Sequence, residues 1–138
     1  MRFTEQEHID GFAKAFIEKS YRDRFSQIKS SKRVRDKVRV KLSHFNHFID
    51  EKIHRVAGDL QNLESIYKLL INSLPHVPDE GYIVSENSEI DGKFYPLAEC
   101  LVKVDGRGLS SIISIVPGKL AYYEGEDMGE RCILKENI

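Results

Sequence analysis

The hydrophobic periodicity of the chain changes at Pro78, and this change constrains the fold more than any other feature of the sequence. Before Pro78, apolar residues recur every three or four positions, which is typical of amphipathic helices. After it, short apolar runs are separated by turn signals such as Asp91-Gly92 and Pro117-Gly118, which is typical of strands. The sequence therefore predicts an α+β fold: an N-terminal three-helix region followed by a small, mostly antiparallel β-sheet with one short helix.

The helical part is predicted to contain helices over residues 5–29, 32–57 and 60–74. Thr4 and Glu7 have the spacing of a capping box for the first helix, and Ser31 is the candidate N-cap of the second. An apolar stripe over 34–56 favours one continuous second helix, although the alternating segment 38–42 also fits a short strand.

In the β-rich part, 82–84 and 131–134 are predicted strands, and 110–124 is a predicted hairpin. The segment 96–104 fits a short helix that begins near Pro96, but its alternating residues also fit a strand. We expect the three helices to cover one face of the sheet. The segment 96–104 should cover the other face or extend an edge.

The length of 138 residues suits a single domain, with a helical part at 4–75 and a β-rich part at 80–138. A hydrophobic content of 41% and a net charge of −1 argue against disorder. No apolar run approaches the roughly 20 residues of a membrane span, and the polar start lacks the apolar region of a secretory signal. We expect a cytosolic protein without a membrane partner, in which Cys100 and Cys132 are buried free thiols.

No motif in the sequence specifies a reaction. Leu120 follows Gly118-Lys119 where a phosphate loop has Ser or Thr, and the patterns of zinc modules and dinucleotide sites are missing. We therefore expect no catalytic residues and no cofactor. The leading hypothesis is a non-enzymatic binding or regulatory protein that acts through charged surfaces.

Charge is unevenly distributed along the chain. Residues 19–41 hold ten Lys or Arg against two Asp, whereas residues 79–138 hold twelve Asp or Glu against six Lys or Arg. The basic segment predicts one of three roles: a solvated face, contact with the acidic half of the same chain or of a partner such as a second copy, or binding of nucleic acid.

Phosphate binding would use Lys32, Arg35 and Arg39, which form one helical ridge beside the apolar stripe. Arg33 and Lys37 lie on the far side of the same predicted helix. No aromatic residue interleaves with this cluster to stack on bases.

Two further clusters are candidate sites. Tyr122, Glu124, Glu126 and Asp127 form a candidate acidic patch for a basic partner protein. His44, His47, Glu51 and His54 step by 3, 4 and 3 residues along the predicted second helix, so they would share one face. That spacing allows a metal site and a metal-dependent hydrolase, or simply an exposed polar face.

Overall fold

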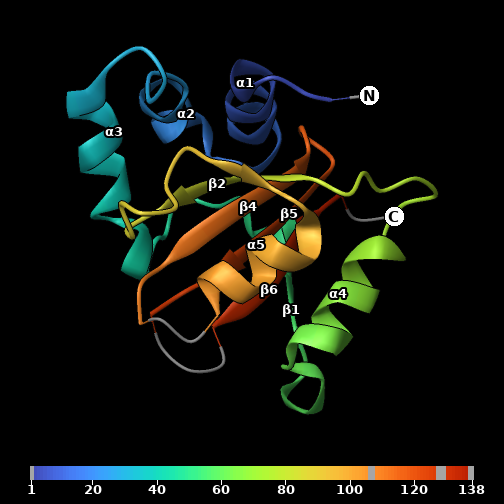
Figure 1. Cartoon of the computed structure of the whole chain (residues 1–138). Helices are drawn as coiled ribbons and strands as arrows, with labels where there is room; N and C mark the ends of the chain where they lie inside the picture. Colours follow the sequence, from blue (N-terminus) through green and yellow to red (C-terminus); the bar gives the residue numbers. More distant parts are fainter. Residues whose placement is uncertain (1, 106–107, 127–129, 137–138) are drawn as a thin grey trace.

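The computed structural model describes residues 2–105, 108–126 and 130–136. Within these residues the chain has an α+β fold with five α-helices, three 3-10 helices and six β-strands (Figure 1). The α-helices are α1 (Glu5–Phe16), α2 (Lys19–Ser26), α3 (Lys32–Arg39), α4 (Leu63–Ile71) and α5 (Leu97–Val104). The 3-10 helices are η1 (Leu42–His44), η2 (Asp50–Lys52) and η3 (Gly58–Leu60). The strands are β1 (Ile53–Arg55), β2 (Gly81–Ser85), β3 (Phe94–Tyr95), β4 (Ser111–Val116), β5 (Leu120–Glu124) and β6 (Arg131–Lys135).

All six strands belong to one antiparallel sheet in the order β1-β6-β5-β4-β2-β3. The β4–β5 hairpin confirms the hairpin predicted over 110–124. Gly118 in its turn has a φ of +73°, a conformation that favours glycine. A Cβ on Gly11 of α1 would lie 2.8 Å from the Cβ of Pro117. Glycine at position 11 therefore lets the hairpin turn approach the helix closely.

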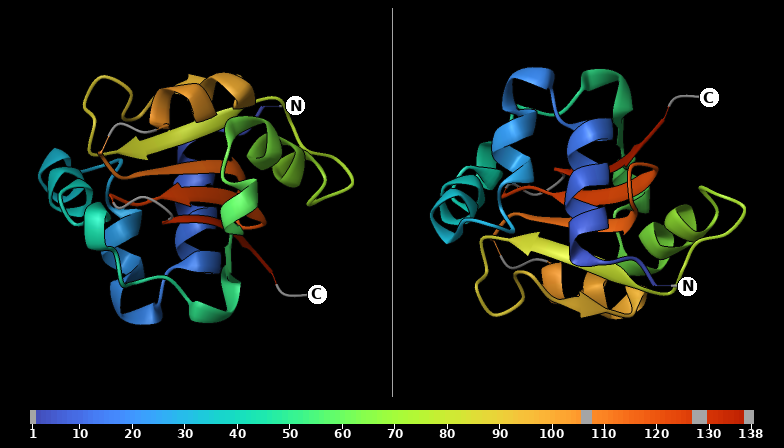
Figure 2. Two further views of the ribbon diagram at one scale, coloured as in Figure 1. Left: turned by 90° about the horizontal axis from the view of Figure 1, so that it is seen from below. Right: turned by 90° about the horizontal axis from the view of Figure 1, so that it is seen from above.

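Helices cover both faces of the sheet, which gives the molecule three layers (Figure 2). On one face, α1, α2 and α3 bury a cluster that includes Phe12 and Phe25 together with Tyr123 of β5. On the other face, α4 and α5 pack residues such as Leu70 and Leu101 against the opposite side of the same strands. The sheet is therefore an internal layer rather than an exposed one.

The predicted layering is right for α1, α2, α3 and α5 but wrong for α4. The sequence predicts α4 beside the other N-terminal helices, but it lies on the same face of the sheet as α5. The reason is the edge strand β1, which comes between α3 and α4 in the chain. By running along the edge of the sheet, the chain passes from one face to the other before α4 begins.

The predicted helix over 5–29 is two helices. The capping box of Thr4 and Glu7 is present at the start of α1. Ile17 is extended after α1, with φ −101° and ψ 133°, and it forms a bridge with Phe48. The amide of Glu18 also donates to the carbonyl of His47 at 2.8 Å. The backbone hydrogen-bonding groups between α1 and α2 therefore find partners in a segment that is distant in the sequence. The helix can end here, and α2 can turn back toward the sheet.

The continuous helix predicted over 32–57 is wrong beyond Arg39. Ser31 caps α3 as expected, because its side chain accepts from the amide of Val34. After α3 the chain forms η1, η2 and then β1, which pairs with β6. Leu42 and Phe48 are buried, although the segment that contains them is not an α-helix. The spacing of the apolar residues therefore indicates burial here but not helical geometry.

The remaining elements lie close to their predicted positions. The helix predicted over 60–74 is the shorter α4, which Asn62 caps through the amide of Ser65. The segment 96–104 is the helix α5 rather than a strand, and the strands predicted at 82–84 and 131–134 are β2 and β6.

His8 is buried where α1 meets the sheet. Its side chain is 1% exposed, stacks on the ring of Tyr82, and shares a hydrogen bond of 2.7 Å with the hydroxyl of Ser114. Burial lowers the pKa of His8 to about 4, and the nearby charge of Glu7 opposes this shift only in part. The folded state therefore favours the neutral form of His8.

We predict that His8 makes the protein sensitive to mild acid. The folded protein holds its proton less tightly than the unfolded chain, so stability is full above about pH 6.5 and falls as the pH drops towards 4. The loss attributable to His8 is on the order of 2 kcal/mol. Urea unfolding of the native protein and of His8→Gln at several pH values measures it. The variant should lose less stability over this range, and equal slopes would contradict the prediction.

Candidate functional site on helices α2 and α3

Arg35 lies on the inner side of α3 and is tied to the body of the protein. Its Nε and Nη2 atoms donate to the two carboxylate oxygens of Asp91 at 2.8 and 3.0 Å, and both side chains are nearly buried. Burial opposes the charge of Arg35, but its hydrogen bonds and attraction to Asp91 outweigh that cost and raise its pKa. This bidentate geometry is the strong form of an arginine–carboxylate pair.

Arg39, one turn further along α3, binds the same part of the chain. Its Nε donates to the carbonyl of Ser85 at 2.6 Å, and its Nη2 donates to that of Glu86 at 3.2 Å. Asp36 accepts from its Nη1 at 3.1 Å. Two guanidinium groups thus fasten α3 to the segment that follows β2.

Lys32 differs from the two arginines. Its side chain is 88% exposed and pairs with Asp36 at 3.1 Å. The structure therefore does not assemble Lys32, Arg35 and Arg39 into an open phosphate site. Both arginines already have partners in the acidic half of the same chain. Such contact is one of the roles predicted for the basic segment.

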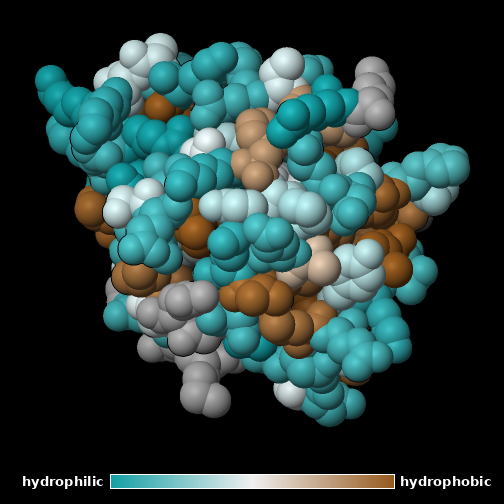
Figure 3. All heavy atoms as spheres, viewed as in Figure 1, coloured by the Kyte–Doolittle hydropathy of each residue, from teal (hydrophilic) through white to brown (hydrophobic). Residues whose placement is uncertain are grey.

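A different set of cations faces outward. Arg24 of α2 and Arg33 and Lys37 of α3 line a shallow hollow of about 390 Å³, together with Gln27 and Val34. No Asp or Glu is among these described lining residues, and no described carboxylate lies within ion-pair distance of the three cations. Hydrophilic side chains dominate this side of the molecule, at the upper left of Figure 3.

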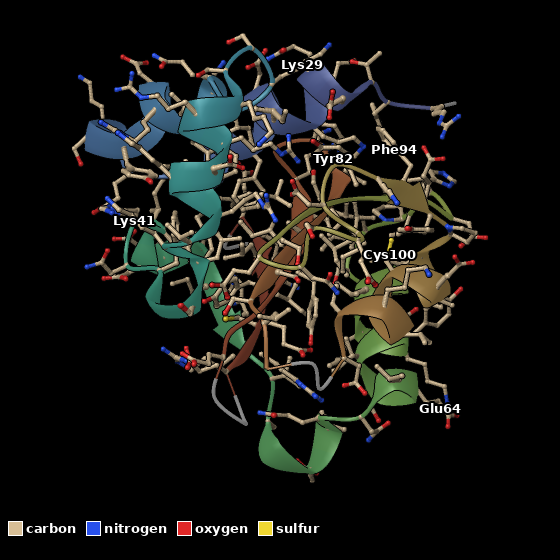
Figure 4. The ribbon with its side chains drawn as sticks, turned by 60° about the vertical axis from the view of Figure 1, so that its left-hand side comes forward. Lys29, Lys41, Glu64, Tyr82, Phe94 and Cys100 are labelled. Carbon is tan, nitrogen blue, oxygen red and sulfur yellow. The ribbon has the colours of Figure 1, made fainter. Side chains whose placement is uncertain are left out.

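Exposed lysines extend this feature beyond the hollow. Lys29 precedes α3 and Lys41 follows it, so the two mark opposite ends of the helix in Figure 4. We call the exposed cations Arg24, Lys29, Arg33, Lys37 and Lys41 the outer basic surface. The signal for the outer basic surface in the sequence is the position of each cation relative to the apolar stripe. Residues beside the apolar stripe reach the body of the protein, whereas those on the far side remain in water.

The candidate acidic patch is largely inside the protein. Tyr122 and Glu124 are 1% and 6% exposed, and the Tyr122 hydroxyl donates to Glu124 at 3.1 Å. Arg131 lies 3.4 Å from the same carboxylate. Neither Tyr122 nor Glu124 is open to a partner. Glu126 is exposed, and Asp127 lies outside the described residues.

The histidine cluster does not form, because the helix that would have carried it ends at Arg39. His47 donates to Glu18 at 3.0 Å and stacks on Tyr21, whereas His54 lies on β1 and donates to the carbonyl of Lys135 at 3.3 Å. Glu51 is exposed in η2, and His44 lies in η1. Over the residues whose placement is described, no three or more His, Cys, Asp or Glu side chains gather to hold a metal ion.

Both cysteines are buried free thiols, as expected. Cys132 faces the layer of α1–α3, and Cys100 lies between α5 and the sheet (Figure 4). Burial raises the pKa of Cys100 to about 12 and that of Cys132 to about 11. These thiols therefore remain protonated at neutral pH and pack as small apolar side chains.

Comparison with known proteins gives no match to a family model, to a curated protein or to a solved structure. None of the helices formed by the described residues is both long enough and apolar enough to cross a membrane.

We predict that Arg35→Gln destabilises the protein by about 2–4 kcal/mol, because it leaves the carboxylate of Asp91 nearly buried without its main cation. Urea unfolding measures this loss. Arg33→Gln removes the same charge two residues away, from the outer side, and should change stability by less than about 0.5 kcal/mol. Similar losses in the two variants would show that Arg35 does not anchor α3.

Proposed function

We propose that the protein is a non-enzymatic binding protein that engages an acidic partner protein through the outer basic surface. The observation that carries the proposal is the hollow between α2 and α3, which Arg24, Arg33 and Lys37 line without a carboxylate. Unneutralised charges of one sign on one face attract and orient a partner of opposite charge.

The contrast between the two sides of α3 supports this proposal. Arg35 and Arg39 already bind groups of the same chain, so their charges need no external partner. Arg33 and Lys37 make no such contacts with the described part of the chain, although the whole chain carries a net charge of only −1. A local basic surface on a nearly neutral protein favours a partner protein with a matching acidic patch over a nucleic acid, which a strongly basic domain binds better.

Nucleic acid is the competing partner, since phosphates would also fit a cationic hollow. The described aromatic residues of α2, Tyr21 and Phe25, are 7% and 1% exposed, and α3 has none. These two helices therefore offer no aromatic platform for stacking bases. Binding of an acidic protein surface requires only positive charges, which the outer basic surface supplies.

We predict that labelled poly-L-glutamate binds the protein at low salt and that binding weakens as salt rises. The double substitution Arg33→Gln and Lys37→Gln should reduce the affinity roughly tenfold, because it removes two exposed charges from the hollow. Fluorescence anisotropy at low and physiological salt measures both effects. Mixed-sequence RNA and DNA pools are titrated in the same way.

The matched control is Lys93→Gln with Lys119→Gln. This variant removes the same charge from exposed positions outside α2 and α3, and it should bind poly-L-glutamate almost normally. An equal loss in both variants would show that net charge, not this surface, drives binding. Tighter binding of RNA or DNA than of poly-L-glutamate would replace the proposal with a nucleic-acid function.

A further inference from the structure

Three cations of the outer basic surface, from two different helices, line the hollow between α2 and α3. Arg24 belongs to α2, whereas Arg33 and Lys37 stand one turn apart on the same side of α3. Gln27, one turn after Arg24, adds an amide group that can donate hydrogen bonds. The hollow of about 390 Å³ therefore offers three positive charges and several N–H donors to one small ligand group.

The described carboxylates of the same two helices do not neutralise these cations. Asp36 of α3 has one oxygen 3.1 Å from Lys32 and the other 3.1 Å from Arg39, so both are already engaged. Asp23 precedes Arg24 in α2, and adjacent residues of a helix do not face each other. Neither Asp23 nor Asp36 is among the described residues that line the hollow. Like charges that share a hollow repel one another, and an external anion relieves this repulsion.

The number of charges and donors in the hollow discriminates between kinds of anion. A carboxylate carries one negative charge and two acceptor oxygens, and each phosphodiester of a nucleic acid also carries one charge. A phosphate monoester carries a charge of about −1.5 to −2 at neutral pH and has three strong acceptor oxygens. Guanidinium groups bind such a phosphate through pairs of parallel hydrogen bonds. The monoester therefore matches the hollow better in charge and in acceptors than either alternative.

We propose that the hollow receives a phosphorylated side chain of the acidic partner protein. Arg24 and Arg33 bind the phosphate from the two helices, and Lys37 adds a third positive charge. Lys29 and Lys41 lie beyond the two ends of α3, where they meet acidic residues that flank the phosphorylated one (Figure 4). This inference rests on the proposed function, because it names the acidic group of the partner that enters the outer basic surface.

Three labelled peptides with identical flanks of glycine and glutamate test the proposal. The centre of the peptide is phosphoserine, serine or a pair of glutamates, so the first and the third have nearly the same charge. Fluorescence anisotropy at low salt should show that the phosphopeptide binds at least about tenfold more tightly than the diglutamate peptide, because only the phosphate concentrates its charge on three acceptors. The serine peptide should bind most weakly.

The outcomes separate this inference from the proposed function. Equal affinities for the phosphopeptide and the diglutamate peptide would overturn the inference and leave the binding of an acidic partner intact. The same holds if poly-L-glutamate binds and the phosphopeptide does not. If neither ligand binds at low salt, both proposals are wrong.

The double substitution Arg24→Lys and Arg33→Lys separates hydrogen-bond geometry from charge. It keeps both charges but removes the paired donors, so the preference for the phosphopeptide over the diglutamate peptide should fall at least about threefold. The matched control is Arg2→Lys with Arg55→Lys, which changes two exposed arginines outside α2 and α3 and should keep the full preference. An unchanged preference in the first variant, or an equal fall in the control, would show that the phosphate does not bind in this hollow.

Discussion

Both faces of the sheet are buried, and the placement of the helices follows from this burial. Every residue of β2 and β5 is buried, and so is nearly all of β4. Strands of this kind need a layer of helices on each side, which is why α4 and α5 lie opposite α1, α2 and α3. Charge must then lie on the outer sides of the helices or be paired internally, as Glu124 and Arg131 are.

Helix α3 shows how a strongly charged helix is held against the buried sheet. It is strongly basic and has one fully buried apolar residue, Val38, so apolar contact alone holds it weakly. Arg35 and Arg39 supply the missing attachment through the carboxylate of Asp91 and the carbonyls of Ser85 and Glu86. Two of the three residues predicted to bind phosphate, Arg35 and Arg39, therefore have a structural role. The outward residues Arg33 and Lys37 form the surface available to a partner.

Local signals predicted much of the fold. The capping box at Thr4, the Ser31 cap and the turn at Gly118 each depend on a few neighbouring residues, and all three are present. The chain after Arg39 was not predictable in this way, because Ile53 pairs with Leu134 far along the sequence. An apolar residue every three or four positions fits a helix, but it also fits an irregular segment whose burial is set by distant contacts. The expectation that His44, His47, Glu51 and His54 share one helical face depended on that continuous helix.

The arginines of α2 and α3 divide into an inner and an outer group, and their chemical reactivity in the native protein tests this division. The protein is treated with phenylglyoxal, which modifies accessible guanidinium groups, and the rate at each arginine is followed by mass spectrometry of peptides. We expect rapid modification of Arg24 and Arg33, and protection of Arg35 and Arg39 until the protein is unfolded in urea. Similar rates at Arg24, Arg33, Arg35 and Arg39 in the native protein would contradict this division.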